Sequence, residues 1–173
     1  MDVSGSMRGE KIATARSSLL QFINLLDDRD RLAIILFSED VVTLTPLSHL
    51  GEKRDDVARR VSAVSEHGDT RLYRAVDMAY DDLLTNGDPH HIRAMVVLSD
   101  GEETVHDMTL NQLLERFGSA GEGGTAPKIF TIAFGGDADR EVLRRIAEMS
   151  GGTQFNSDPE TINEVYAIIA TFF

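Results

Sequence analysis

Short apolar runs alternate with amphipathic segments along the whole chain, and this alternation constrains the fold more than any other feature. The runs 32–37, 94–98 and 129–134 are apolar almost throughout, which predicts strands buried on both faces. Between and after them, apolar residues recur every three or four positions, as in helices with one buried face. These stripes are Ile12, Leu19, Ile23 and Leu26; Val57, Val61 and Val64; Leu72, Val76, Ala79 and Leu83; Leu110, Leu113, Leu114 and Phe117; Val142, Ile146 and Met149; and Ile162, Val165, Ile169 and Phe172.

Strands that alternate with helices of this length imply right-handed crossovers. The predicted fold is therefore a Rossmann-like, doubly wound α/β domain whose mostly parallel sheet carries helices on both faces. Segment 41–47 is the exception, because the short turn 38–40 joins it to run 32–37 and Pro46 lies within it. It is expected to be one antiparallel edge strand. A short strand is expected around 153–155. At 173 residues and 42% hydrophobic composition, the chain is expected to form a single domain over residues 1–173.

The charge balance excludes several classes of function. Lys and Arg number 17 and Asp and Glu number 29, a formal net charge of −12, which argues against binding to nucleic acid or to anionic membranes. No apolar run approaches the length of a membrane span, so direct membrane insertion is not predicted either. The chain has no cysteine, which excludes disulfides, thiolate metal sites and a cysteine nucleophile. The negative charge favours cations, or partners with basic patches, as ligands.

Hard oxygen ligands occur in three loops that precede predicted helices. Asp2, Ser4 and Ser6 lie before the first helix, Thr70 lies before the third, and Asp100 follows the strand 94–98. In a parallel sheet, ligands bind beyond the carboxyl ends of the strands. Asp, Ser or Thr at one such place is an ordinary helix cap, but three loops together offer two carboxylates and three hydroxyls. This set suits Mg²⁺, which takes about six oxygen ligands, and Mn²⁺ is also compatible with it.

The composition of this predicted site also indicates its chemistry. Two carboxylates neutralise a divalent cation, and hydroxyls add ligands without adding charge. The ion then stays electrophilic toward one more anionic oxygen from outside. No base or nucleophile for attacking a bound partner is evident in the sequence. The site is therefore expected to bind a partner's carboxylate and not to catalyse a reaction.

Three motifs resemble the metal-ion-dependent adhesion site of von Willebrand factor type A domains. They are Asp2-Val3-Ser4-Gly5-Ser6-Met7, Gly68-Asp69-Thr70 and Leu98-Ser99-Asp100-Gly101, in the order and approximate spacing of that family. The stretches 7–12, 69–73 and 157–162 are similar to bacterial members from envelope proteins. The resemblance implies a bacterial cell-envelope or extracytoplasmic location, and loop and last-helix shifts on ligand binding.

The resemblance also implies roles for the five candidate residues. Ser4, Ser6 and Thr70 are expected to contact Mg²⁺ directly or nearly so, and Asp2 and Asp100 to hold it directly or through water. A Glu or Asp of a protein ligand would complete the shell.

One departure from the family concerns the start of the chain. In the family an apolar central strand leads into the Asp-x-Ser-x-Ser loop, and here only Met1 precedes Asp2. We therefore expect a fragment of a longer protein, truncated at its N-terminus and missing the first central strand. A gap is then predicted between the strands 32–37 and 94–98. Domain swapping, in which a neighbouring chain fills the gap, is a further prediction.

Three other functions are compatible with parts of the sequence. A Mg²⁺-dependent phosphohydrolase of the haloacid dehalogenase type shares the early Asp, but normally has Asp-x-Asp where this chain has Ser4, and no lysine is predicted in a strand-end loop. The order Asp2, His67 and Ser150 faintly resembles a subtilisin-type triad. A metal-free scaffold of the same fold is the third. The glycine-rich stretch 118–124 lacks the Lys-Ser/Thr ending of a phosphate-binding loop, so nucleotide binding is not predicted.

Overall fold

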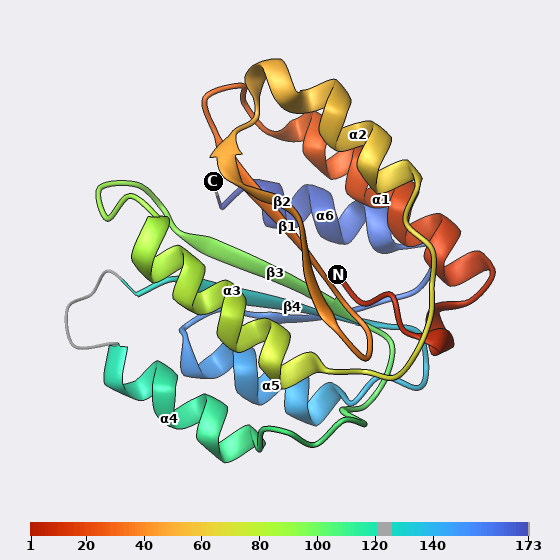
Figure 1. Cartoon of the computed structure of the whole chain (residues 1–173), viewed down its shortest axis with the longest axis vertical. Helices are drawn as coiled ribbons and strands as arrows, with labels where there is room; N and C mark the ends of the chain where they lie inside the picture. The colour runs from red at the N-terminus through yellow and green to blue at the C-terminus, as the bar shows by residue number, and fades with distance from the viewer. Residues whose placement is uncertain (121–125, 173) are drawn as a thin grey trace.

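The computed structural model describes residues 1–120 and 126–172, with strands in the centre and helices on both sides of them (Figure 1). The elements are the 3-10 helix η1 (Gly5–Met7), α1 (Glu10–Leu25), β1 (Arg31–Phe37), β2 (Val41–His49), the 3-10 helix η2 (Gly51–Lys53), α2 (Arg54–Ser62), α3 (Leu72–Asn86), β3 (Ala94–Ser99), α4 (Leu110–Ala120), β4 (Lys128–Phe134), α5 (Arg140–Met149), β5 (Gln154–Ser157) and α6 (Ile162–Ala170).

The strands pair as two hydrogen-bonded groups. β3, β4 and β5 form a parallel sheet in that order, and β1 and β2 form an antiparallel pair. β2 contains Pro46 and pairs only with β1 in the described part of the chain, which confirms the predicted antiparallel edge strand. The predicted short strand around 153–155 is β5, and it extends to Ser157.

β3 and β4 of the main sheet bury residues on both faces, and β4 shows this most clearly. Phe130, Ile132 and Phe134 belong to a core cluster shared with α1, α2 and α6. Ile129 and Ala133, on the opposite face, belong to a cluster shared with α3, α4 and α5. The same two groups of helices lie on opposite sides of the strands in Figure 1. The doubly wound α/β fold is confirmed, and two-sided burial explains why the strand sequence is uniformly apolar.

Residues 1–3 lie between the two groups of strands. The Asp2 N–H donates to the carbonyl of Leu98 in β3 (2.9 Å), and the Val3 N–H donates to the carbonyl of Phe37 in β1 (2.8 Å). Asp2 and Phe37 form an isolated parallel bridge. This short segment therefore occupies the position of a central strand, but only at the carboxyl ends of β1 and β3. Towards the amino ends, the facing edges of β1 and β3 pair neither with each other nor with another strand in the described part of the chain, which is the predicted gap.

Some predicted details at helix ends are wrong. Met149 is 48% exposed and Phe172 is 44% exposed, although both were expected in the core. Met149 is the last residue of α5, and Phe172 lies beyond α6 with its ring against Phe130 (4.8 Å between centroids). Positions 118–120, predicted to begin a loop, continue α4, and the rest of the glycine-rich stretch lies outside the described residues.

Candidate metal centre

Asp2 is the anchor of the first site loop. It is fully buried, and both of its carboxylate oxygens accept hydrogen bonds. The Ser4 N–H donates to Oδ1 (2.8 Å), and the Ser99 hydroxyl donates to Oδ2 (2.6 Å). Burial raises the pKa of Asp2; the hydrogen bonds from Ser4 and Ser99 oppose this shift, and the nearby charge of Asp100 adds to it. The side chain is thus fixed between the carboxyl ends of β1 and β3.

Ser4 and Ser6 connect this loop to the end of β3. The hydroxyls of Ser4 and Ser6 lie 3.0 Å apart, and the Ser6 hydroxyl donates to Oδ1 of Asp100 (2.7 Å). This bond joins residues 94 positions apart in the sequence. The η1 turn carries Ser6, and the Gly5 N–H donates to the carbonyl of Gly68 (2.9 Å), which fixes the turn against the loop before α3.

Thr70 enters the site from that loop. It is buried, its N–H donates to the hydroxyl of Thr104 (2.8 Å), and its carbonyl accepts from the N–H of the same residue (2.9 Å). A Cβ placed on Gly101 would lie 3.5 Å from the Ser6 hydroxyl and 3.8 Å from the Thr70 hydroxyl. Both hydroxyls therefore border Gly101, next to Asp100. The structure brings all five predicted side chains together.

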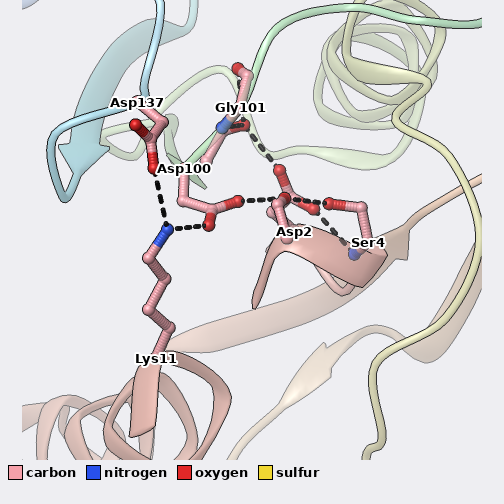
Figure 2. Close-up of polar contacts among 8 residues, drawn as sticks. Asp2, Ser4, Lys11, Asp100, Gly101 and Asp137 are labelled. Carbon is pink, nitrogen blue, oxygen red and sulfur yellow. Dashed lines mark hydrogen bonds and ion pairs between the residues drawn. The ribbon is translucent and has the colours of Figure 1, made fainter. Parts of the chain in front are cut away.

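Lys11 is a member of this cluster that the sequence did not identify. It lies near the start of α1, and Figure 2 shows its side chain extending to Asp100 and Asp137. Its Nζ is 2.6 Å from Oδ2 of Asp100 and 3.7 Å from Oδ2 of Asp137. Burial alone would lower the pKa of Lys11, but the hydrogen bond and charge of Asp100, with a smaller effect of Asp137, raise it. The Lys11 ammonium group is thus a cation that the fully buried carboxylate of Asp100 already attracts.

The donor set fits a hard divalent cation. It consists of oxygens only, and hydrogen bonds of 2.7–3.0 Å join Ser4, Ser6 and Asp100 into one continuous group. Among the described residues, no three His, Cys, Asp or Glu side chains gather in an arrangement that could hold a metal. A metal held at this place would therefore depend on two carboxylates supplemented by hydroxyls, a set suited to Mg²⁺ or Mn²⁺ and poorly suited to soft metals.

The family follows from a comparison with known proteins. A family model described as the von Willebrand factor type A domain matches residues 1–168. The chain belongs to this family. Inter-alpha-trypsin inhibitor heavy chain H4 of Sus scrofa is 25% identical over 158 residues, covering 88% of this chain. Heavy chain H3 of Homo sapiens is 27% identical over 156 residues, covering 85%. The chain spans only 17% of the length of each.

Solved structures of other von Willebrand factor type A domains share the fold. A von Willebrand factor type A protein from Catenulispora acidiphila superposes with a TM-score of 0.84 at 22% identity, over 98% of this chain and 40% of that one. Manganese-loaded TRAP protein of Plasmodium vivax gives 0.74 at 21% identity, over 99% and 70%. Proximal thread matrix protein 1 from the mussel byssus, with a zinc-occupied MIDAS motif, gives 0.77 at 13% identity, over 98% and 45%. Domains of this fold thus hold divalent metals.

The subtilisin-type arrangement considered for this von Willebrand factor type A domain is not formed. The Ser150 hydroxyl accepts from the N–H of Ile129 (2.8 Å) near the amino end of β4, whereas Asp2 lies at the carboxyl end of β3. Nε2 of His67 is 3.1 Å from the Ser38 hydroxyl. Asp2, His67 and Ser150 therefore cannot act as a triad.

Proposed function

We propose that this von Willebrand factor type A domain binds a protein partner through a divalent cation, Mg²⁺ or Mn²⁺, held by Asp2, Ser4, Ser6, Thr70 and Asp100. The observation that carries the proposal is the hydrogen bond between Ser6 and Asp100, which draws the first loop and the end of β3 into one oxygen cluster bordered by Thr70. When bound, the cation supplies a Lewis-acidic position that attracts an anionic oxygen of the partner.

Each of these residues has a distinct part in the proposed site. Asp2 orients the loop, because its two oxygens are already engaged by Ser4 and Ser99. Asp100 supplies the negative charge that faces the other groups of the cluster, since its two oxygens contact Ser6 and Lys11. Ser4, Ser6 and Thr70 supply neutral oxygens. Because only two carboxylates offset the charge of the cation, a Glu or Asp side chain of a partner is the ligand we expect to complete the shell.

Metal binding is tested by thermal melts in EDTA and then in millimolar Mg²⁺ or Mn²⁺, with calorimetric titration of each metal. A ligand that binds only the folded state raises stability by about 2.7 kcal/mol at a hundredfold excess over Kd. Asp100→Asn should abolish the metal-induced rise. Asp137→Asn is the matched control, because Asp137 also contacts Lys11 but its side chain is 86% exposed and touches none of the five proposed ligands. An equal metal response in the parent and in Asp100→Asn would contradict the proposal.

The carboxylate preference needs a separate test. In the Mn²⁺-loaded domain, a glutamate-containing peptide should displace metal-bound water and lower the enhancement of water-proton relaxation. The same peptide with glutamine in place of glutamate should leave the relaxation unchanged. An equal effect of both peptides would leave the metal site in place but refute carboxylate recognition.

A phosphohydrolase is the remaining alternative of a different class, and Lys11 beside Asp100 makes it worth one assay. Such an enzyme needs Asp2 as an accessible nucleophile, and Asp2 is fully buried with both oxygens hydrogen-bonded. We expect no hydrolysis of p-nitrophenyl phosphate above background. Turnover that disappears in Asp2→Asn would favour the enzyme over the binding module.

We infer a bacterial cell-envelope location for the protein that contains this domain. Its support is the resemblance to bacterial envelope modules and the likeness, at a TM-score of 0.77 and 12% identity, to the type V pilus tip protein Mfa5 of Porphyromonas gingivalis. Within the described residues, no helix has the length and apolarity needed to cross a bilayer. Fractionation of the native cells with an antibody to this domain tests the location, and recovery only with cytoplasmic markers would refute it.

A further inference from the structure

The connection that follows β3 is bonded to the loop that carries Thr70. The Thr70 N–H donates to the hydroxyl of Thr104 (2.8 Å). The Thr70 carbonyl accepts from the N–H of Thr104 (2.9 Å) and from that of Val105 (3.3 Å). Both backbone polar groups of buried Thr70 are therefore held by a segment that begins just after Asp100. The two loops of the proposed metal centre are joined here by backbone geometry as well as by their ligand side chains.

Glu103 fastens the same segment to α3. Its Oε2 accepts from the N–H of Tyr73 (2.8 Å), in the first turn of α3, and its Oε1 accepts from the N–H groups of Val105 and His106 (3.3 Å each). The residue at the N-cap of α3, Arg71, makes no side-chain cap hydrogen bond. Glu103 supplies an acceptor there from a distant part of the sequence, and its negative charge is favourable near the N-terminus of a helix.

The burial of Glu103 makes this arrangement rigid. Glu103 is only 9% exposed, so its carboxylate depends on these three N–H donors. They come from two places, the first turn of α3 and the backbone on the far side of Thr104. Moving Thr104 away from Thr70 would therefore also disturb the bonds of a buried carboxylate. We call Glu103 and Thr104 together the clasp.

The Thr70 hydroxyl has to be placed accurately if it is to bind a cation. Its loop is tied to the first site loop by the bond from the Gly5 N–H to the Gly68 carbonyl (2.9 Å), and the clasp ties it to the segment after Asp100. The hydroxyl borders Gly101, where a Cβ would lie 3.8 Å from it. Mg²⁺ takes oxygen ligands at about 2.0–2.1 Å in nearly octahedral geometry, whereas Ca²⁺ tolerates about 2.3–2.6 Å and irregular shells. A ligand held within about 0.5 Å of its required position therefore suits Mg²⁺.

We propose that Glu103 and Thr104 are positioning residues of the metal centre. Thr104 sets where the Thr70 hydroxyl lies relative to Asp100, and Glu103 keeps Thr104 in place by fastening its segment to α3. Both act through Thr70, and neither is a ligand. The inference rests on the proposed function, because it concerns the same cation and the same hydroxyl.

Calorimetric titration with Mn²⁺ tests the part played by Thr104. Thr104→Val keeps the shape of the side chain but removes the oxygen that accepts from the Thr70 N–H, and it should weaken Mn²⁺ binding by about tenfold. Thr104→Ser keeps the hydroxyl and should bind as the parent does. Thr109→Val is the matched control, because it removes a hydroxyl from the same connection, where Thr109 bonds to Gln112 in α4. Its Kd should equal that of the parent.

The double variant separates positioning from general support of the fold. In a protein that already carries Thr70→Val, Thr104→Val should cause no further loss of Mn²⁺ affinity, because the ligand that it positions is gone. Glu103→Gln, which replaces one of the two acceptor oxygens by an NH₂ group, should weaken binding in the parent and likewise have no effect beside Thr70→Val. In Thr104→Val alone, affinity for Mg²⁺ should fall more than affinity for Ca²⁺, since Ca²⁺ accepts a looser shell.

Amide hydrogen exchange in EDTA examines the clasp without any metal. The Thr70 amide should exchange at least about tenfold faster in Thr104→Val than in the parent, while amides within β4 stay unchanged. Equal Mn²⁺ affinity of the parent and Thr104→Val, or losses that simply add in the double variant, would overturn the proposal and leave the metal centre in place. A parent that binds no Mn²⁺ would refute the metal centre itself, and this proposal with it.

Discussion

Lys11 should weaken metal binding by competing with the metal for Asp100. Its Nζ lies 2.6 Å from Oδ2 of Asp100, and the Lys11 side chain is only 25% exposed. A cation that binds at Asp100 has to share or displace this ammonium group. The substitution Lys11→Met removes the charge and keeps an unbranched side chain. We therefore expect it to have opposite effects on the metal-free and the metal-bound protein.

The magnitude follows from the burial of the pair. Removing one member of a fully buried ion pair costs about 3–5 kcal/mol, and partial exposure of Lys11 reduces this to about 2 kcal/mol. In EDTA, Lys11→Met should thus lower the melting temperature by roughly 4–8 °C for a domain of this size. A bound divalent cation satisfies Asp100 in place of Lys11, so the penalty disappears in the complex. By linkage, about 2 kcal/mol corresponds to metal binding that is roughly 30-fold tighter.

Melting curves in EDTA and calorimetric titration with Mn²⁺ measure the two effects on the same samples. Asp137→Asn serves as the control, because it removes only the second, exposed partner of Lys11, 3.7 Å away. Asp137→Asn should change neither the melting temperature in EDTA nor the Kd for Mn²⁺ appreciably. The reasoning fails if Lys11→Met lowers the melting temperature but leaves the Kd for Mn²⁺ unchanged or weakens it, since Lys11 would then support the metal loop and not compete for it.

Four further substitutions test the fold and the site. Gly152→Ala should lower the free energy of unfolding by about 3 kcal/mol, because a Cβ there would overlap the carbonyl oxygen of Ile129. Gly118→Ala in α4, with open space around it, should raise that free energy by about 0.5–1 kcal/mol. Urea denaturation measures both changes, and a neutral Gly152→Ala would contradict the packing. Ser99→Ala should lower the free energy of unfolding by about 1–3 kcal/mol, because it leaves one oxygen of buried Asp2 without its hydrogen-bond donor. An unchanged melting temperature would refute this role of Ser99. Thr70→Val should weaken Mn²⁺ binding by about tenfold or more without unfolding the domain, and an unaltered titration would remove Thr70 from the site.

The fold was largely predictable from the sequence because its strands are buried on both faces. Strands such as β4 carry Phe130 and Ile132 towards one layer of helices and Ile129 and Ala133 towards the other, so the apolar run is continuous and easy to recognise. Helix ends were less predictable. Met149 continues the periodic spacing of α5, but the helix ends there and its last turn lies partly outside the core. The spacing of apolar residues in the sequence specifies which face of a helix is buried. How far along the helix that face is covered depends on the neighbouring elements.

The candidate site was predictable as a set of loops but not as a set of contacts. Parallel strands present their carboxyl ends at one edge of the sheet, and this rule was sufficient to group Asp2, Thr70 and Asp100. It could not identify Lys11, which lies within α1 and reaches the site only because of the direction of its side chain. The one available signal is its position in the first turn of the helix that follows the Asp-x-Ser-x-Ser loop. Ser99 was quoted within a motif, but its bond to Asp2 depends on the register of residues 1–3 between β1 and β3.

That register couples the proposed metal centre to the strands on either side of it. The backbone of Asp2 is held by Leu98 of β3, and the next residue, Val3, is held by Phe37 of β1. These bonds set the position from which Ser4 and Ser6 extend towards Asp100. These two bonds to the strand ends restrict residues 2–6 before any metal arrives. Part of the ordering cost of the loop is thus met by folding, and less of it remains to be met when a metal binds.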